Sequence, residues 1–332
     1  MKVTENFNLK NNNTLAINCY CEQFILVENM HDVEKVVPYV GKQGLFILGS
    51  GSNLLFTKNI EKPVVHLTNR FHARVVDGLT VVWGGSQWSD LVKWAAKKGL
   101  GGIENLADIP GTVGAAPVQN IGAYGQEVKN TIVWVEIFNY RTNMFQRLSN
   151  KECRFMYRTS IFKEMENPWI ITRVAFELRP DSEINLSYDG VKEELEKNNN
   201  FNPNYQDMVD VITTIRQRKL PDYHELPNVG SFYKNPIIDE KHHKKLARKY
   251  ADLIAYPLEA NHYKISAAWL LEKCGFRGHR MHECGFSEKH ALVLVNYGES
   301  TGKEIISLSK EAIRAVNQKF KIKLKVEPEI IL

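Results

Sequence analysis

Apolar residues recur along the chain with two spacings, and each spacing predicts a type of element. Apolar positions three or four residues apart predict helices over residues 31–40, 86–98, 191–197, 208–219, 266–274 and 301–320. Short continuous or alternating apolar runs predict strands over residues 44–48, 54–56, 63–68, 73–76, 79–83, 132–140, 144–148, 169–178 and 322–332. Strands interleaved with few helices favour an α+β fold over a doubly wound parallel sheet.

Residues that start and stop elements support this pattern. Asp77-Gly78 is a good turn for the first hairpin. Ser86 can cap the helix that follows, and Gly99 can end it. Pro221 stops the helix that precedes it.

The elements group into three predicted domains. Residues 1–68 form a small α/β unit, residues 69–204 consist mainly of hairpins, and residues 205–320 are more helical. The terminal strand, residues 321–332, is expected to pack back near the active site.

Composition excludes several classes of protein. The 332 residues are 43% hydrophobic and 24% charged, an ordinary globular balance with enough length for two or three domains. The net charge of +5 is mild, and no run of Lys or Arg alternates with aromatic residues, so no nucleic-acid partner is expected. No apolar run has the length of a signal-peptide core or a membrane span, which predicts a cytoplasmic protein without membrane insertion. The five scattered cysteines read as reduced thiols.

The segment from Gly102 to Gly125, GIENLADIPGTVGAAPVQNIGAYG, carries the clearest chemical signal. Its glycines and alanines leave the backbone nearly bare, so a large flat ligand can approach N–H and C=O groups directly. Its few polar side chains suit a largely apolar pocket with some orienting groups. A glycine-rich surface loop is the alternative, but surface loops of this length usually carry more charge. We therefore expect a buried segment that faces a cofactor.

A second glycine-rich motif, GSGSN at residues 49–53, directly follows a predicted strand. Successive N–H groups in such a turn can form an anion-binding nest. It matches neither the dinucleotide fingerprint G-x-G-x-x-G nor a P-loop, and a tight hairpin turn is the alternative.

Arg158 lies in a stretch of apolar and aromatic residues, 155–162. A guanidinium in such surroundings has to be paired. The partner is either a carboxylate of the protein core or a carboxylate or phosphate of a substrate, for which the planar fork is well suited.

Cys274, His279, His282 and Cys284 invite a zinc interpretation. Their spacing, C-x4-H-x2-H-x-C, is not that of a recognised zinc finger or ribbon, so no metal site is predicted. A zinc-stabilised binding protein remains an alternative.

Several motifs, in order along the chain, resemble the UDP-N-acetylenolpyruvoylglucosamine reductase family of flavoenzymes. PGTVGAAPVQNIGAYGQE is similar to the family's flavin-contacting loop, and GSGSN matches its pyrophosphate loop. YRTSIFK, GSFYKNP, SAAWLLEKCGFRG, SEKHALVLVNYG and the terminal PEI also match family patterns. SYDG resembles the extra tyrosine loop of the family's first subtype.

The resemblance implies a fold and a reaction. Two subdomains would bind FAD noncovalently in the manner of the vanillyl-alcohol oxidase (PCMH-type) flavoproteins, and a C-terminal α+β domain would bind substrate. NADPH would be the cosubstrate, and hydride would pass by way of FAD to the vinyl carbon of a nucleotide sugar in peptidoglycan precursor synthesis. A monomer is favoured. A different FAD-dependent oxidoreductase on the same fold is the alternative.

The resemblance also implies roles for individual residues. The catalytic residues would be Arg158, Ser231 as proton donor, and Glu329. The cofactor-binding residues would be Gly49, Ser50, Gly51, Ser52, Asn53, Pro110, Gly111, Thr112, Gly114, Ala115, Gln119, Asn120, Gly122 and Ala123. The substrate-binding residues would be Tyr124, Tyr188, Lys219, Asn235 and His290.

Overall fold

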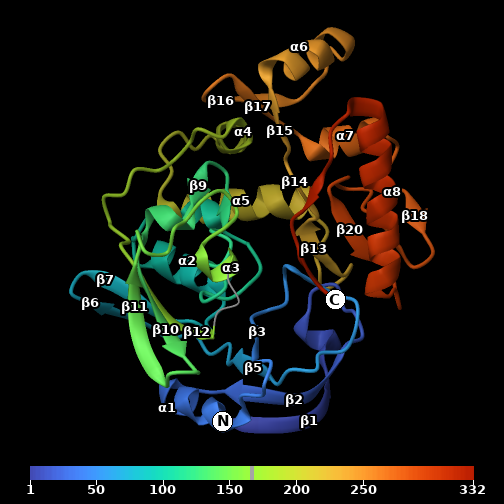
Figure 1. Cartoon of the computed structure of the whole chain (residues 1–332). Coiled ribbons are helices and arrows are strands. Elements are labelled where there is room, and N and C mark those ends of the chain that lie inside the picture. The colour runs from blue at the N-terminus through green and yellow to red at the C-terminus, as the bar shows by residue number, and fades with distance from the viewer. Residues whose placement is uncertain (165–167) are drawn as a thin grey trace. The chain divides into compact units, whose positions relative to one another are not determined.

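The computed structural model describes residues 1–164 and 168–332 (Figure 1). Its contacts divide the chain into two compact units. Unit 1 comprises residues 1–7, 20–50 and 60–216, and unit 2 comprises residues 8–19, 51–59 and 217–332. Both units combine helices with sheets, which confirms the predicted α+β class.

The first sheet of unit 1 is built from strands near the N-terminus. Its order is β1 (Lys2–Asn8), β2 (Tyr20–Val27), β5 (Val64–Leu67) and β3 (Phe46–Leu48). β5 lies parallel to both β2 and β3. The helix predicted over 31–40 is instead α1 (Met30–Val33) followed by a 3₁₀ segment (Glu34–Tyr39) that contains Pro38. Proline has no N–H to donate, which explains the break in the α-helix.

The second sheet of unit 1 is antiparallel. Its order is β11 (Met144–Ser149), β10 (Ile132–Asn139), β12 (Trp169–Phe176), β7 (Leu79–Trp83) and β6 (Ala73–Val76). Both predicted hairpins are confirmed, and Asp77 and Gly78 have the positive φ angles, 51° and 77°, of a type I′ turn.

Unit 1 also contains helices, 3₁₀ segments and two short strands outside these two sheets. They are α2 (Trp88–Lys97), the 3₁₀ segments Glu104–Leu106 and Val128–Asn130, β8 (Gly122–Ala123), β9 (Gln126–Glu127), α3 (Ile161–Glu164), α4 (Asp189–Lys197) and α5 (Tyr205–Lys219), whose last three residues belong to unit 2. α2 buries Trp88, Leu91 and Val92 in the core, as its apolar spacing predicts. The prediction that Ser86 caps α2 is wrong, because the N-cap is Gln87 and the Ser86 hydroxyl accepts from the N–H of His72 at 3.1 Å.

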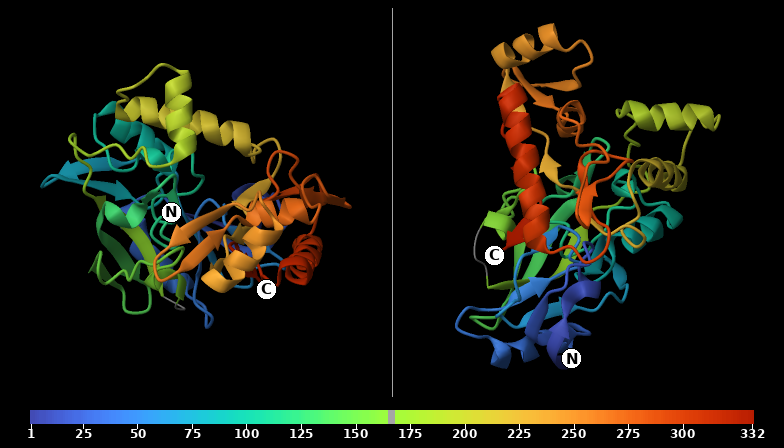
Figure 2. Two further views of the ribbon diagram at one scale, coloured as in Figure 1. Left: turned by 90° about the horizontal axis from the view of Figure 1, so that it is seen from above. Right: turned by 90° about the vertical axis from the view of Figure 1, so that its right-hand side faces the viewer.

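Besides the end of α5, unit 2 contains four small sheets, three α-helices and the 3₁₀ segment Leu9–Asn12. The sheets are β13 (Asn228–Ser231), β20 (Val293–Asn296), β19 (Cys284–Phe286) and β18 (Arg280–Met281); β14 (Tyr233–Lys234) and β21 (Lys325–Val326); β15 (Ile237–Asp239), β17 (His262–Ile265) and β16 (Ala255–Leu258); and β22 (Glu329–Ile331) with β4 (Leu54–Phe56). The helices are α6 (Glu240–Lys249), α7 (Ala267–Lys273) and α8 (Gly302–Phe320). Figure 2 shows α8 as one long continuous helix, and Thr301 and Glu304 form a capping box at its start.

Two early segments of the chain fold as part of unit 2. β4 pairs in parallel with β22, so that Leu54 lies opposite Glu329. Gly51 has a φ of +61°, and a Cβ there would overlap the main chain of Asn12. A Cβ on Gly302 would likewise overlap the carbonyl of Phe56, so the start of α8 lies against the end of β4. Among the described residues, no helix is both long and apolar enough to cross a membrane.

The buried side chain of His66 on β5 makes stability depend on pH. His66 is 7% exposed, its Nδ1 lies 2.9 Å from the carbonyl oxygen of Leu48, and burial lowers the pKa of its imidazole. The unfolded chain therefore takes up a proton before the folded chain does. We expect the free energy of unfolding to be highest above pH ~6.5 and to fall below it, by at most about 1.4 kcal/mol per pH unit for one proton.

Denaturant unfolding of His66→Gln at several pH values tests this expectation. The variant should lose part of the decline between pH ~6.5 and pH ~5 that the parent protein shows. His31→Gln, at an exposed position of α1, is the matched control and should leave the decline intact. The same decline in both variants and the parent would contradict a role for His66.

Candidate functional site

In unit 1 the structure brings the two glycine-rich motifs together. A Cβ on Gly49 would lie 3.1 Å from Thr112 Oγ1 and 3.5 Å from the Cβ of Ala115. The Ser50 hydroxyl lies 3.4 Å from Gln87 Oε1, and Gln87 itself forms a β-bridge with Thr112. The start of the first motif therefore lies against the middle of the second.

Main-chain hydrogen bonds hold the second motif in place. The N–H of Val113 donates to Ser86 O at 2.8 Å, and that of Gly114 donates to Gly84 O at 2.7 Å. The carbonyl of Gly111 accepts from the N–H of Trp88 at 2.9 Å. These bonds fix residues 111–114 along the end of β7 and the start of α2.

This arrangement fits a large flat cofactor. Several accessible members of the segment are small or polar, namely Gly114, Ala115, Gln119, Gly122 and Ala123, all partly exposed. A Cβ on Gly114 would come within 3.0 Å of Gly84 O, so the backbone leaves no space for a larger residue there. Bare backbone beside an anion-binding turn suits the ring system and phosphates of FAD. Of the other predicted residues of this stretch, Pro110 is partly exposed, and Gly111 and Thr112 are buried.

Asn120, a predicted cofactor residue, is engaged by the protein itself. Its side chain is buried and donates to Glu127 Oε2 at 2.9 Å and to the carbonyl oxygen of Met156 at 3.1 Å. Its Oδ1 accepts from the N–H of Lys129 at 3.1 Å. Asn120 therefore ties the glycine-rich segment to the turn that carries Arg158.

Arg158 lies at this turn, next to the glycine-rich segment. Met156 and Thr159 bond each other across Tyr157-Arg158, and Arg158 has a φ of 57°, which is unusual for a residue other than glycine. Its Nη1 would be 3.4 Å from a Cβ on Gly122. Arg158 is half-buried and its Nε is buried, whereas Met156 is 54% and Tyr157 is 43% exposed. Phe155 and Phe162, at the two ends of the apolar stretch, pack against the core.

Tyr124 and Tyr188, both predicted substrate residues, contact each other. Their rings pack edge to face with centroids 5.0 Å apart. Burial raises the pKa of the Tyr124 phenol, and a hydrogen bond from Arg216 opposes that shift. Arg216 also donates through Nε to the carbonyl oxygen of Asp108 at 3.1 Å. We did not predict Arg216 as part of this cluster, because its side chain reaches Tyr124 only in the folded chain.

In unit 2, Ser231 is exposed at the end of β13. Gly230 has a φ of +68°, and the pairing of β13 with β20 is irregular between Asn228 and Ser231. This bulge turns the Ser231 side chain out of the ladder. Beyond it, Asn235 Oδ1 accepts from the N–H of Ala267 at 2.9 Å, at the start of α7.

His290 lies near Lys219 in the same unit. Its Nδ1 accepts from the N–H of Leu292 at 3.2 Å, so the neutral ring carries its proton on Nε2. Burial lowers the pKa of His290, and the charges of Lys219 and Arg277 lower it further. A neutral imidazole with one N–H to donate suits an oxygen-rich ligand.

Glu329 lies beside the end of the GSGSN motif. Its N–H donates to the carbonyl oxygen of Asn53 at 2.9 Å, as β22 pairs with β4. Its side chain is exposed, while Gly51, Ser52 and Asn53 form the turn next to it. The predicted catalytic glutamate and half of the predicted phosphate turn therefore share one edge of unit 2.

The zinc alternative finds no support in the part of the chain that the structure describes. No three His, Cys, Asp or Glu side chains there are placed to hold one ion. The Cys284 thiol is directed to the carbonyl oxygen of Met281 at 3.3 Å, and none of the five cysteines, all of which the structure describes, forms a disulfide.

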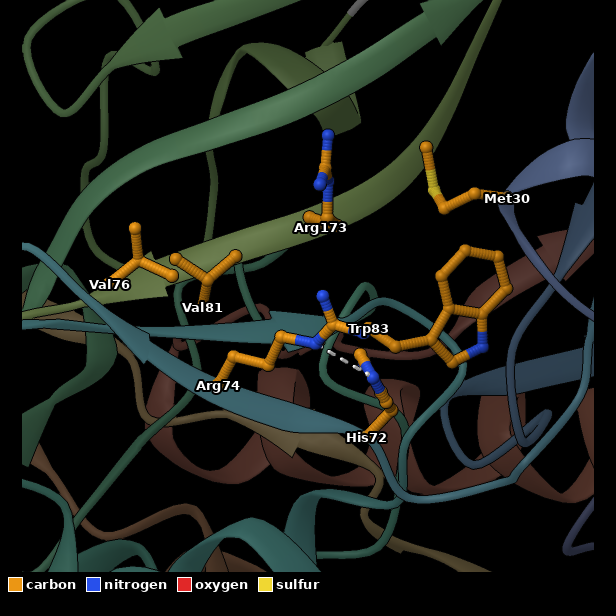
Figure 3. Close-up of a pocket in the computed structure, with 7 residues that line it drawn as sticks. All are labelled: Met30, His72, Arg74, Val76, Val81, Trp83 and Arg173. Carbon is orange, nitrogen blue, oxygen red and sulfur yellow. Dashed lines mark hydrogen bonds between the residues drawn. The ribbon is translucent and has the colours of Figure 1, made fainter.

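Unit 1 also has a cavity of about 230 Å³, lined by Met30, His72, Arg74, Val76, Val81, Trp83 and Arg173 (Figure 3). None of the motif residues above belongs to it. Arg74 Nε donates to His72 Nε2 at 3.2 Å, and Arg173 binds both carboxylate oxygens of Glu136 at 2.7 Å. Both arginines of this cavity are thus hydrogen-bonded to side chains of the protein. We therefore place the candidate site at the motif residues and not in this cavity.

Both glycine-rich motifs and the C-terminal part of the chain lie in regions that match known protein families. A family model described as an FAD binding domain matches residues 21–146, and one described as the C-terminal domain of UDP-N-acetylenolpyruvoylglucosamine reductase matches residues 221–331. UDP-N-acetylenolpyruvoylglucosamine reductase from Flavobacterium johnsoniae is 40% identical, with all of both chains aligned. The enzyme of that name from Pseudomonas aeruginosa is 34% identical over 99% of each chain.

A solved structure shares the fold. The crystal structure of UDP-N-acetylenolpyruvylglucosamine reductase from Thermus caldophilus aligns over 100% of both chains, with a TM-score of 0.70 and 24% sequence identity. At that identity the likeness speaks for the fold, and it agrees with the predicted FAD-binding architecture with a C-terminal domain.

Proposed function

Because this chain belongs to the UDP-N-acetylenolpyruvoylglucosamine reductase family, whose members are FAD-containing oxidoreductases, we propose that it reduces the enolpyruvyl ether of its nucleotide-sugar substrate to a lactyl ether with NADPH. The observation that carries the proposal is the meeting of three motifs in unit 1. Gly49 lies against Thr112, and the Arg158 guanidinium lies against Gly122. These motifs are far apart in sequence, and a flavin site requires them together.

The residues that would hold FAD come from both glycine-rich motifs. We assign the phosphates to Gly49, Ser50, Gly51, Ser52 and Asn53, and the ring system to the stretch from Pro110 to Ala123. When bound, FAD would supply the hydride-transfer chemistry that links NADPH to the vinyl carbon of the substrate.

Arg158 would stabilise the negative charge that develops during reduction. Hydride addition to the vinyl carbon leaves an enolate spread over the neighbouring carbon and the carboxylate. A guanidinium fork can bind both carboxylate oxygens and is worth most where this charge appears. Glu329 would support the same species, for which it must carry its proton or act through its neighbours.

Ser231 would donate the proton that completes the lactyl ether. Its hydroxyl hydrogen moves to the carbon next to the carboxylate as the enolate collapses. A serine hydroxyl is a weak acid in water, but a strongly basic enolate and a nearby cation such as Lys219 make the transfer feasible. Tyr124, Tyr188, Asn235 and His290 would hold the remainder of the nucleotide sugar.

The reaction supplies a precursor of peptidoglycan, so the protein would serve cell-wall biogenesis and, through it, cell shape and division. We place it in the cytoplasm as a monomer. Gel filtration of the purified protein and fractionation of cells test these two assignments.

The visible spectrum of the purified protein tests the proposed function. We expect a yellow protein with an absorption maximum near ~450 nm, released into the supernatant by acid because the flavin is noncovalent. NADPH should bleach this band without oxygen, and the enolpyruvyl nucleotide sugar should restore it. A colourless protein that FAD cannot reconstitute would contradict the proposal. A flavin that the nucleotide sugar leaves reduced would indicate a different flavin-dependent oxidoreductase.

A further inference from the structure

The turn that carries Tyr124 is strained. β8 and β9 pair through Ala123 and Gln126, so Tyr124-Gly125 is a two-residue hairpin loop. Tyr124 has a φ of 47° and Gly125 a φ of +79°, the signs of a type I′ turn. Asparagine, aspartate and glycine are the usual residues here, whereas a tyrosine in this conformation needs support from its surroundings.

Asn105 provides that support. It is fully buried, and its Nδ2 donates to the carbonyl oxygen of Tyr124 at 2.9 Å. The same Nδ2 donates to the carbonyl oxygen of Asn185 at 2.8 Å. One amide group therefore holds both the Tyr124 turn and the segment that leads to Tyr188.

Two neighbours of Asn105 make it rigid. Its N–H donates to Gln126 Oε1 at 3.1 Å, and Gln126 Nε2 donates to Glu104 Oε1 at 3.3 Å. The other oxygen of the buried Glu104 accepts from the N–H of Gly102 at 2.6 Å. This network leaves the Asn105 side chain little freedom to follow a moving loop.

The orientation of the amide shows which bonds matter. Asn105 Oδ1 is buried without a hydrogen-bond partner among the described residues. Rotating the amide would satisfy neither side, because it would point an oxygen at two carbonyl oxygens. An unsatisfied acceptor in the interior is costly, so this residue is best explained by the two bonds that its Nδ2 donates.

Hydrogen bonds hold the segment 180–188 in place as far as Asn185, and residues 186–188 are exposed. The Tyr205 hydroxyl donates to the carbonyl oxygens of Pro180 and Ser182 at 3.0 and 2.8 Å. Asn185 Nδ2 donates to the carbonyl oxygen of Gly125 at 3.0 Å. Tyr188, three residues on, is 37% exposed and packs on Tyr124. The Asn105 bond is thus the last buried attachment before the exposed tyrosine.

We propose that Asn105 is a positioning residue that presents Tyr124 and Tyr188 to the substrate as one aromatic pair. It acts through the two loops and does not touch the substrate. The inference rests on the proposed function, since it assigns the pair to the nucleotide sugar. Asn105 would then help to determine substrate affinity although it binds neither cofactor nor substrate.

Asn105→Asp tests the inference, because it keeps the shape of the side chain and removes both donated bonds. We expect the KM for the enolpyruvyl nucleotide sugar to rise roughly 10-fold, as for the loss of a buried hydrogen bond at a binding loop. FAD content and the rate of bleaching by NADPH should stay within about 2-fold of the parent. In a Tyr188→Ala background the same substitution should raise KM by a smaller factor, because part of its effect is already gone.

Asn150→Asp is the matched control. Asn150 is in the same unit, and its Nδ2 also donates to two main-chain carbonyl oxygens, those of Lys129 and Ile132, both at 2.7 Å. Its loss should lower stability without raising KM. Should Asn105→Asp not fold, Asn185→Ala removes the bond to Gly125 at a less buried position, and a smaller rise in KM is expected.

Amide hydrogen exchange separates failure of this inference from failure of the proposed function. In Asn105→Asp, residues 122–127 and 182–188 should exchange faster, and in Asn150→Asp they should not. If Asn105→Asp exchanges faster but the parent protein does not reduce the nucleotide sugar, the proposed function is rejected and the structural role of Asn105 is retained. An active parent with unchanged KM and unchanged exchange in Asn105→Asp would overturn the inference, as would equal slowing of both half-reactions.

Discussion

Replacing Ser231 with alanine will slow the half-reaction with the enolpyruvyl substrate by about 10²- to 10⁴-fold, the usual contribution of a positioned general acid. The half-reaction with NADPH will run at nearly the parent rate, because it requires no proton at a carbon atom. Ser231 is exposed at the β13 bulge, and the alanine Cβ occupies the place of the serine Cβ, so FAD and both substrates should bind almost as before. Stopped-flow absorbance near ~450 nm follows each half-reaction separately.

Ser307→Ala is the control for Ser231, since Ser307 is an exposed serine of α8 in the same unit. It should leave both half-reactions unchanged. Equal slowing of both half-reactions in Ser231→Ala would show that Ser231 acts on the structure of the unit. A normal rate with the enolpyruvyl substrate would mean that water or another group supplies the proton.

Replacing Arg158 with alanine will lower kcat with the enolpyruvyl substrate by about 10²- to 10³-fold, the effect of removing a group that stabilises a developing oxyanion. Its guanidinium lies against Gly122, and its φ of 57° shows that the turn holds it in an unusual conformation. Arg158→Lys should recover only part of the loss, because an ammonium keeps the charge but cannot bind two oxygens in parallel. Steady-state kinetics with NADPH in excess measures both variants.

The chain offers a close control for Arg158. Arg154 is exposed in the same loop and also has a positive φ, 49°. Arg154→Ala should therefore reproduce any general effect of losing an arginine there and leave kcat near the parent value. If Arg154→Ala and Arg158→Ala were equally impaired, the guanidinium of Arg158 would have no specific role in the reaction.

Local sequence signals predicted the elements that depend on local chemistry. Asp77-Gly78 predicted a hairpin because few other pairs accept two positive φ angles, and the periodic apolar positions predicted α2, α7 and α8 within one or two residues. The helix over 31–40 was only partly right, because Pro38 turns its second half into a 3₁₀ segment. The pairing of β4 with β22 could not be predicted, since a parallel pair between distant segments leaves no local pattern.

Motifs predicted the candidate site better than physical patterns alone. The bare backbone of 102–125 pointed to a cofactor, but its packing against Gly49 depends on the sheet that places both segments. The apolar stretch around Arg158 divides in the fold, because Phe155 and Phe162 pack on the core while Met156 and Tyr157 at the turn face solvent. Asn105 and Arg216 were missed as partners of Tyr124, since their side chains reach it only in the folded chain. The catalytic and binding roles stay predictions until the variants are measured.

Because β4 pairs with β22, unit 2 cannot be completed until both strands have been translated. Residues 51–59 are translated long before their strand partner, Glu329–Ile331. The early segments of unit 2 therefore stay unpaired until residue 331 has been made, whereas unit 1 has all its residues available after residue 216. Cutting the gene after that codon would not yield two self-sufficient proteins, because the second product would lack two of its own segments.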